Sequence, residues 1–366
     1  MLEEQKQALH QILMYVKQYK PEVVLIAGDI YDRSVPGTEA VCLFHTFLEQ
    51  LHETGTKICF ISGNHDSGER LHFAGGILKE SGVYPVGIYE GNIKYVQLQD
   101  DYGDVYIWLL PFLNPAKVSI YHKEGYSYTE ALQAVLQAEG FLKEDTQAYP
   151  EWLQKGRHIL LAHQFVTDKG KAEVCDSEFH TVGGIDEVDV SLFRDFDYVA
   201  LGHLHGEQWI GRETVRYAGS PIKYSASEVE QKKSVTLVEL KEKGNIAIQL
   251  LPLTPIHDMR VIKGPLKALI SEEVVKAGDA RDYMHVILTD EKELYDALGQ
   301  LRVVYPNLMS LKIVHREEPS LSMQSIYSTK ETPIVELFTQ FYEMQNGVSL
   351  QIEEMDLLKK YLEELA

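Results

Sequence analysis

Four short apolar runs in this 366-residue chain each end directly in side chains that bind metal ions. The runs are residues 23–27, 57–62, 158–162 and 197–202, and they lead into Asp29, into Asn64-His65-Asp66, into His163 and into His203-Leu204-His205 respectively. Short apolar runs bounded by turn residues are typical of buried strands. In α/β sheets, ligands gather at the carboxyl ends of the strands. The pattern therefore predicts an α/β fold in which these side chains converge.

The types of side chain indicate which ion they would bind. Carboxylate, amide and imidazole groups together suit divalent manganese, iron or zinc. A carboxylate can also bridge two ions, and two cations about 3.5–4 Å apart polarise a phosphate and activate a water. His203 and His205 are two positions apart on an extended segment, so they point to opposite sides and could face different ions. Each motif alone is weak, since a lone histidine is more often packed or solvated; their joint occurrence favours a metal site.

Hydrophobic periodicity predicts how the chain is divided. Helices are expected up to Pro21 and over residues 38–52, and further strands over 105–111, 234–240 and 246–253. Beyond Pro255 the expected order is strand, helix, strand, helix, strand, at residues 259–263, 265–276, 283–289, 291–305 and 308–314. The predicted parts are a main domain, a small α/β cap domain, a Ser-rich linker and an amphipathic helical tail, at residues 1–254, 255–318, 319–332 and 333–366.

Composition limits the classes of protein. The net charge of −20 argues against a nucleic-acid binder that relies on its overall charge, although bound metals or a basic partner could supply positive charge locally. The cap, residues 258–318, has nine Lys and Arg against eleven Asp and Glu, which predicts weak, salt-sensitive DNA binding by the isolated chain. The three cysteines form no C-x-x-C pair, and no run of about 18 apolar residues or signal core occurs. We therefore expect a cytoplasmic protein with no membrane span.

These motifs resemble those of the calcineurin-like metallophosphoesterases. The usual order in that family is Asp-x-His, Gly-Asp-x-x-Asp, Gly-Asn-His-Asp, a histidine after a strand, and Gly-His-x-His, of which this sequence shows the last four. The finer resemblance is to the SbcD family of bacterial DNA repair nucleases, and it covers nearly the whole chain. The segments that carry it are LIAGDIYDRSVP, CFISGNHDSGERL, FDYVALGHLH and YAGSPIKYS.

The resemblance implies a β-sandwich flanked by helices that holds two divalent ions, with Mn²⁺ favoured. Asp29 would bridge the ions, Asn64, His163 and His203 would complete one of them, and His205 would bind the other. His65 would be the catalytic imidazole, with Asp66 orienting it. It also implies exonuclease and endonuclease activity on DNA ends or hairpins in repair, recombination and replication, close to the nucleoid. The implied assembly is a homodimer of the nuclease domain within a heterotetramer with an SbcC-like ATPase, whose coiled-coil base the tail is expected to contact.

One departure from the family pattern leaves alternatives open. No Asp-x-His occurs before Asp29, so the first strand of the family is expected to be missing, through a start codon placed too late or a true truncation. The second ion would then keep only Asp29 and His205 as ligands from this chain. We therefore expect the chain to bind one ion tightly and to show little nuclease turnover. Restoring an upstream strand that ends in Asp-x-His should restore the second ion and the turnover. The neighbouring strand would be left with an uncovered edge. A catalytically impaired scaffold is therefore one alternative, and a phosphodiesterase or phosphatase for nucleotides or phosphoproteins is another.

Overall fold

The computed structural model describes residues 1–122, 127–178, 186–290 and 294–314, together with Phe338, Thr339, Tyr342 and Met355. The chain forms two units, Met1–Val314 and His315–Ala366. The predicted linker, residues 319–332, lies outside the described residues, and so does the predicted tail, residues 333–366, apart from those four positions. Within the described part, no helix is both long and apolar enough to cross a membrane.

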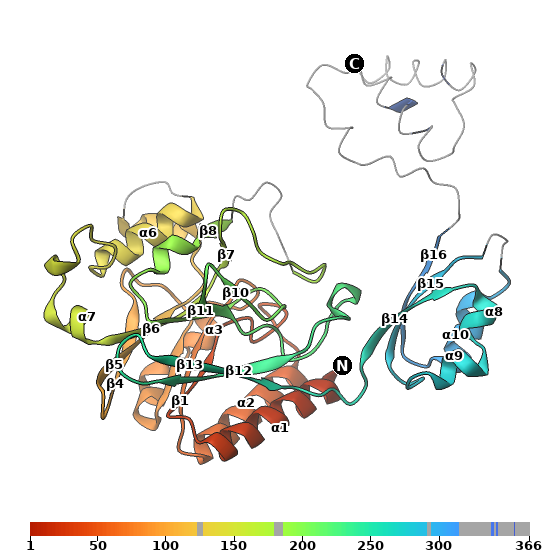
Figure 1. The fold of residues 1–366 in the computed structure, drawn as a ribbon, viewed down its shortest axis with the longest axis horizontal. Coiled ribbons are helices and arrows are strands. Elements are labelled where there is room, and N and C mark those ends of the chain that lie inside the picture. The colour runs from red at the N-terminus through yellow and green to blue at the C-terminus, as the bar shows by residue number, and fades with distance from the viewer. Residues whose placement is uncertain are drawn as a thin grey trace. The chain divides into compact units, whose positions relative to one another are not determined.

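A three-stranded parallel sheet forms the N-terminal part of the main domain (Figure 1). Its order is β1 (Val23–Ile26), β2 (Lys57–Ile61) and β3 (Val83–Val86), and α1 (Leu2–Tyr19) and α2 (Thr38–Glu53) pack on its outer face. The predicted helices and the strand–helix–strand order are confirmed.

The predicted burial of β1 is wrong, since all four of its side chains are only half-buried. The reason is its place at the edge of the sheet, where it pairs only with β2 among the described residues. The neighbouring β2 has a strand on both sides, and four of its five residues are buried. β1 is thus an edge strand of the described sheet.

A six-stranded mixed sheet forms the second layer, in the order β10-β11-β9-β6-β5-β4. Its strands are β4 (Lys94–Asp100), β5 (Gly103–Leu110), β6 (Arg157–His163), β9 (Tyr198–Gly202), β10 (Gln208–Ile210) and β11 (Arg212–Tyr217). The four central strands are parallel, so β6 and β9 end at the same edge. One face is covered by helices, chiefly α5 (Pro115–His122), α6 (Tyr128–Ala138) and α7 (Glu151–Lys155).

The two sheets pack face to face and share one apolar core. Cys59 and Ile61 of the first sheet lie against Ile107, Leu109 and Leu161 of the second, and all five are at most 1% exposed. The hairpin of β12 (Ser234–Leu240) and β13 (Ile246–Pro252) packs its apolar side chains on the same core. The result is a β-sandwich with helices on both outer sides, as predicted.

Short elements connect these layers. They are α3 (Gly68–His72), α4 (Gly75–Leu78), β7 (Phe165–Thr167), β8 (Glu187–Asp189) and the 3₁₀ turns Lys79–Ser81, Thr146–Ala148, Val190–Phe193 and Ala226–Glu228.

The predicted cap domain contains a parallel sheet in the order β14-β15-β16. Its elements are β14 (Met259–Gly264), α8 (Leu266–Leu269), α9 (Glu272–Lys276), β15 (Tyr283–Leu288), α10 (Ala297–Val304) and β16 (Leu308–Ile313). The predicted alternation of strands and helices is confirmed. The helix expected over residues 265–276 is divided in two, because Ser271 adopts the extended backbone of a helix N-cap. Of the helix expected over residues 291–305, the first three residues lie outside the described part.

A fully buried histidine lies in the aromatic core behind the second sheet. The ring of Tyr106 stacks on that of His158 at 5.2 Å between centroids. The Trp108 indole donates a hydrogen bond to Nδ1 of His158 at 3.2 Å, and Nε2 of His158 donates to the Leu153 carbonyl at 3.1 Å. Because an indole can only donate and a carbonyl can only accept, both bonds require a neutral ring. Burial, with a smaller contribution from the charge of Lys243, lowers the pKa of His158 to about 4.

His158 is expected to make the fold sensitive to mild acid. The unfolded chain binds a proton at this ring below about pH 6.5, whereas the folded chain does so only near pH 4. The free energy of unfolding should therefore fall as the pH drops from 6.5 to 4, by about 3 kcal/mol from this residue, and level off below. Urea titrations in EDTA would compare the chain with His158→Gln, which cannot titrate, and with the exposed control His45→Gln. Parallel pH profiles for all three proteins would contradict the prediction.

Candidate metal centre

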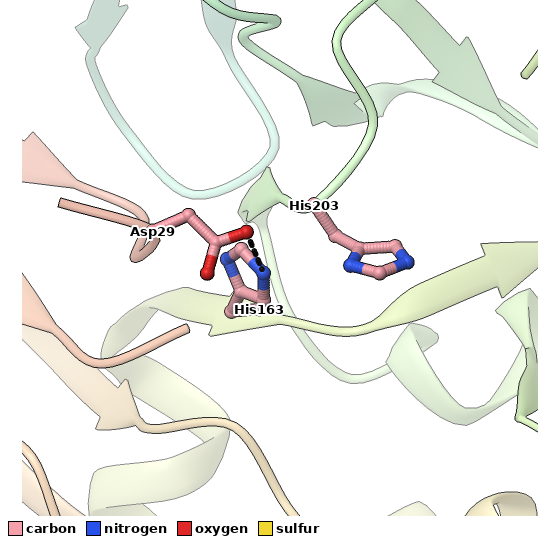
Figure 2. Close-up of side chains that lie close together, drawn as sticks. All are labelled: Asp29, His163 and His203. Carbon is pink, nitrogen blue, oxygen red and sulfur yellow. Dashed lines mark ion pairs between the residues drawn. The ribbon is translucent and has the colours of Figure 1, made fainter. Parts of the chain in front are cut away.

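The four residues predicted to share one ion lie together at the strand ends. Asp29 and Asn64 follow β1 and β2 of the first sheet, while His163 and His203 come from β6 and β9 of the second. Oδ1 of Asn64 lies 3.0 Å from Nε2 of His163 and 3.1 Å from Nδ1 of His203. Oδ2 of Asp29 lies 3.2 Å from Nε2 of His163 (Figure 2). One ligand atom from each of Asp29, His163 and His203 lies within 4.8 Å of the other two.

The backbone segments at these strand ends lie very close to one another and to His163, and they are strained. Gly28 has φ +82°, and a Cβ there would lie 2.6 Å from Nδ1 of His163, so glycine is required. A Cβ on Gly202 would overlap the carbonyl of Ala27. Asp29 and His203 themselves have φ values of +46° and +108°, which L-residues rarely adopt. Strain of this kind gathers at functional sites, where the surrounding structure holds it in place.

The donor atoms at the centre fit a divalent cation. Nδ1 of His163 lies 2.6 Å from the carbonyl of Ala27, which can only accept, so the ring proton is on Nδ1. Nε2 of the neutral ring then presents a lone pair to the oxygens of Asn64 and Asp29. Lone pairs this close repel one another unless a positive charge, a proton or a metal ion, lies among them. One carboxylate, one amide and two imidazoles are a donor set for manganese, iron or zinc.

The carboxylate of Asp29 is held ionised. Burial alone would raise its pKa, but a proton that takes the place of the ion on Nε2 of His163, together with the backbone N–H and charge of His65, outweighs burial and lowers it. The His65 N–H donates to Oδ1 at 3.0 Å and leaves Oδ2 toward His163. Asp29 therefore presents a negative charge to the centre near neutral pH.

The ring of His65 is positioned differently from the expectation. Its Nδ1 lies 3.2 Å from the carbonyl of Asp32, to which it donates. The expected orientation of this ring by Asp66 is wrong, because the Asp66 carboxylate instead accepts from three backbone amides. These are the N–H groups of Gly63 at 2.9 Å, Tyr31 at 3.0 Å and Ile30 at 3.1 Å. These hydrogen bonds lower the pKa of Asp66, but burial has the larger effect and raises it overall. Asp66 thus joins the loops after β1 and β2 and acts on His65 only through the backbone.

His205 lies outside the group of close ligand atoms among the described residues. Its Nδ1 contacts Oγ of Ser177 at 2.9 Å and Oε1 of Glu228 at 3.3 Å, and its N–H donates to the carboxylate of Glu178. Its assignment to a second ion remains a prediction. The sequence alone did not point to Ser177 or Glu228. The one local signal, Ser225 three residues before Glu228, is that of a capping box and indicates only a turn.

Comparisons with known proteins agree with this geometry. The model of the calcineurin-like phosphoesterase family matches residues 2–207, and a second model, described as Type 5 capsule protein repressor C-terminal domain (SbcD_C), matches residues 255–346. The chain is similar to the SbcD subunit of the nuclease SbcCD from Staphylococcus epidermidis, at 29% identity over 99% of the chain and 93% of the relative. It is equally similar, at 29%, to the SbcD subunit from Staphylococcus saprophyticus, over 85% of the chain and 79% of the relative. Because the first model spans more than half of the sequence and its strand ends hold the ligand cluster, the chain belongs to the calcineurin-like phosphoesterase family.

Proposed function

We propose that this chain is the metal-dependent DNA nuclease subunit of an SbcCD-type complex and hydrolyses phosphodiester bonds at DNA ends or hairpins. The observation that carries the proposal is the convergence of Asp29, Asn64, His163 and His203 from two sheets. The two relatives, both named as SbcCD nuclease subunits, support DNA as the substrate because they align with most or nearly all of this chain. The predicted cap also favours DNA over small phosphate esters, since a minimal phosphatase does not need it.

The residues of the centre have separate tasks in this proposal. Asp29, Asn64, His163 and His203 would hold a divalent ion, with Mn²⁺ favoured by the mixed oxygen and nitrogen donors. When bound, such ions polarise the phosphate and generate the attacking hydroxide. His65, fixed through Nδ1 to the Asp32 carbonyl, would give a proton to the leaving oxygen. In a second ion site, Asp29 and His205 would be the ligands from this chain.

A comparison of substrates tests the proposal. In Mn²⁺, the full chain is offered hairpin and linear DNA, a nucleotide phosphodiester, bis-p-nitrophenyl phosphate and a phosphopeptide, while bound manganese is counted. We expect DNA cleavage at rates above those on the small diesters and no release of phosphate from the peptide. Faster turnover of the nucleotide or the peptide would favour the phosphodiesterase or phosphatase alternative. Bound metal without turnover of any substrate would favour the scaffold.

The partner is proposed to be an SbcC-like ATPase that binds the tail. The tail sequence has two apolar helical faces, which are Ile334, Leu337, Phe338, Phe341 and Tyr342, and Met355, Leu358, Tyr361, Leu362 and Leu365. An apolar face beyond a Ser-rich linker is suited to a groove or coiled coil of a partner. Deletion of residues 330–366 is expected to abolish co-purification with the ATPase and to leave the metal content of the rest unchanged. A complex that survives the deletion would contradict this assignment.

A homodimer is proposed to form through two exposed apolar side chains that follow the loop after β2. Phe73, which follows α3, and Ile77 of α4 are 80% and 76% exposed, although both follow the metal-binding loop of β2 closely. A second copy could cover these side chains across a twofold axis. Phe73→Asp together with Ile77→Asp is expected to turn a dimer into a monomer in light scattering. Ile120→Asp, at a side chain 71% exposed on α5, is the matched control. A dimer that persists in the double variant would place the interface elsewhere.

A further inference from the structure

A buried carboxylate lies behind His205, on the side of the ring that bears Nδ1. Glu228 is 0% exposed, and its Oε1 lies 3.3 Å from Nδ1 of His205 and accepts a 2.7 Å hydrogen bond from Oγ of Ser177. Oγ of Ser177 is itself 2.9 Å from the same Nδ1. The imidazole, the hydroxyl and the carboxylate form one hydrogen-bonded triangle.

The direction of these hydrogen bonds follows from chemistry. Oε2 of Glu228 accepts from the ammonium of Lys233 at 2.6 Å, and Oε1 accepts from the backbone N–H groups of Tyr224 and Ser225 at 3.2 and 3.1 Å, so the group is a carboxylate and only accepts. Ser177 gives its single proton to Glu228, which leaves the serine oxygen as an acceptor toward His205. The proton on this side must therefore belong to Nδ1 of His205. In a neutral imidazole the lone pair is then on Nε2, the atom that a metal ion requires.

A buried lysine fixes both the carboxylate and the backbone of His205. Nζ of Lys233 donates to Oε2 of Glu228 at 2.6 Å and to the carbonyl of His205 at 2.9 Å. Oγ of Ser220 at 2.8 Å and Oε1 of Gln231 at 2.7 Å also lie within hydrogen-bond distance of Nζ, so its three N–H groups have four acceptors around them. A buried ion pair contributes little to stability unless its geometry is good, but it can enforce a unique arrangement. Here it fixes the carboxylate where the imidazole needs an acceptor.

We propose that Glu228 and Ser177 are positioning residues that hold His205 in its Nδ1–H tautomer and present Nε2 to a divalent cation. This inference rests on the proposed metal-dependent function and adds to it the groups that prepare one ligand. A purely structural role for Glu228 is the competing explanation, because its carboxylate also accepts from the backbone N–H groups of Tyr224 and Ser225 at 3.2 and 3.1 Å. A substitution at Ser177 can distinguish the positioning role from the structural role, because the hydrogen bonds of its hydroxyl within the described structure go to His205 and Glu228.

The first test reads the tautomer without metal or substrate. The full chain, labelled with ¹⁵N-histidine, is studied by NMR in EDTA near pH 7.5, and the signals of His205 are assigned by their loss in His205→Asn. We expect a neutral ring with its proton on Nδ1. A ring protonated on Nε2 would overturn the inference. The tautomer is measured without nuclease activity, so the inference can be correct even if the proposed function is wrong. Conversely, a proton on Nε2 would contradict the inference and would not contradict the proposed function.

The second test measures Mn²⁺ binding in matched serine variants. Ser177→Ala removes an acceptor of the imidazole proton and is expected to weaken Mn²⁺ binding at the site that includes His205 by about 10–100-fold. Ser220→Ala is the control, since Ser220 contacts the same lysine and lies 3.4 Å from Oε2 of Glu228, whereas Ser177 contacts Oε1. The Mn²⁺ affinity of Ser220→Ala should stay within about twofold of that of the parent chain, because this variant keeps the groups that hydrogen-bond to the His205 ring. Glu228→Gln, checked for folding by circular dichroism, should mix the two tautomers. Equal effects of the two serine variants, or no effect of Ser177→Ala, would show that the triangle is structural.

Discussion

Replacing Asp29 with Asn is expected to lower both Mn²⁺ affinity and phosphodiester turnover by about 10²–10³-fold each, equivalent to ~3–4 kcal/mol. The substitution keeps the size of the side chain and an oxygen for the His65 N–H, but it removes the negative charge that faces His163. Asparagine is also suited to the backbone at this position, where φ is +46°, whereas alanine would be strained. Loss of function in Asp29→Asn can therefore be attributed to the charge.

Calorimetry with Mn²⁺ and DNA cleavage under the same conditions would measure the two effects. In EDTA the variant should be somewhat less stable than the parent chain near neutral pH, because the contacts of the Asp29 carboxylate outweigh its burial and lower its pKa, so that its charge stabilises the fold. Asp101→Asn removes the same charge at the exposed turn between β4 and β5 and should change neither quantity. Unchanged Mn²⁺ affinity in Asp29→Asn would place the ion at other residues.

Replacing His65 with Ala is expected to reduce DNA cleavage by about 10²–10⁴-fold and to leave Mn²⁺ binding unchanged. The ring of His65 bonds to the carbonyl of Asp32, outside the ligand cluster, and the contact with Asp29 comes from the backbone N–H, which alanine retains. The loss should therefore affect the chemical step alone. Metal loss in this variant would instead make His65 a ligand.

The leaving group provides a sharper readout of the same substitution. A group that protonates the leaving oxygen matters less when that oxygen departs readily as an anion. The penalty for His65→Ala should therefore shrink on bis-p-nitrophenyl phosphate relative to DNA. An equal penalty on both substrates would mean that His65 positions the phosphate and does not deliver a proton. His45→Ala, on the exposed face of α2, is the control and should behave like the parent chain.

The ligand cluster could be predicted from the sequence because it depends on local rules. Ile58, Cys59, Phe60 and Ile61 form a wholly apolar run before Gly63, so the strand and its end were both readable. Parallel strands end at a common edge, and that rule alone placed His163 beside His203. The rule that a short apolar run is a buried strand failed for β1, because burial depends on whether a strand has neighbours on both sides, which its own four residues do not record.

The supporting groups could not be predicted because their partners are not encoded nearby. Asp66 bonds to backbone amides, which every residue except proline carries, so nothing in the sequence distinguished that role from a contact with His65. Ser177 and Glu228 are 28 and 23 positions from His205, and only the packing of the loops brings them to its ring. Glu228 also caps a turn, which is the simpler meaning of its sequence context.

The centre takes two of its four donors from each sheet of the sandwich, so an ion held there would join the two layers. An ion that binds the folded chain and not the unfolded one stabilises the fold by an amount that grows with the logarithm of its concentration. Proteases act mainly on opened or unfolded chains, so the fraction of molecules open to degradation would rise as the metal becomes scarce. When the ion is scarce, the amount of this protein would fall and the catalytic turnover of the remaining molecules would fall too. The concentration of one metal ion would therefore set both quantities.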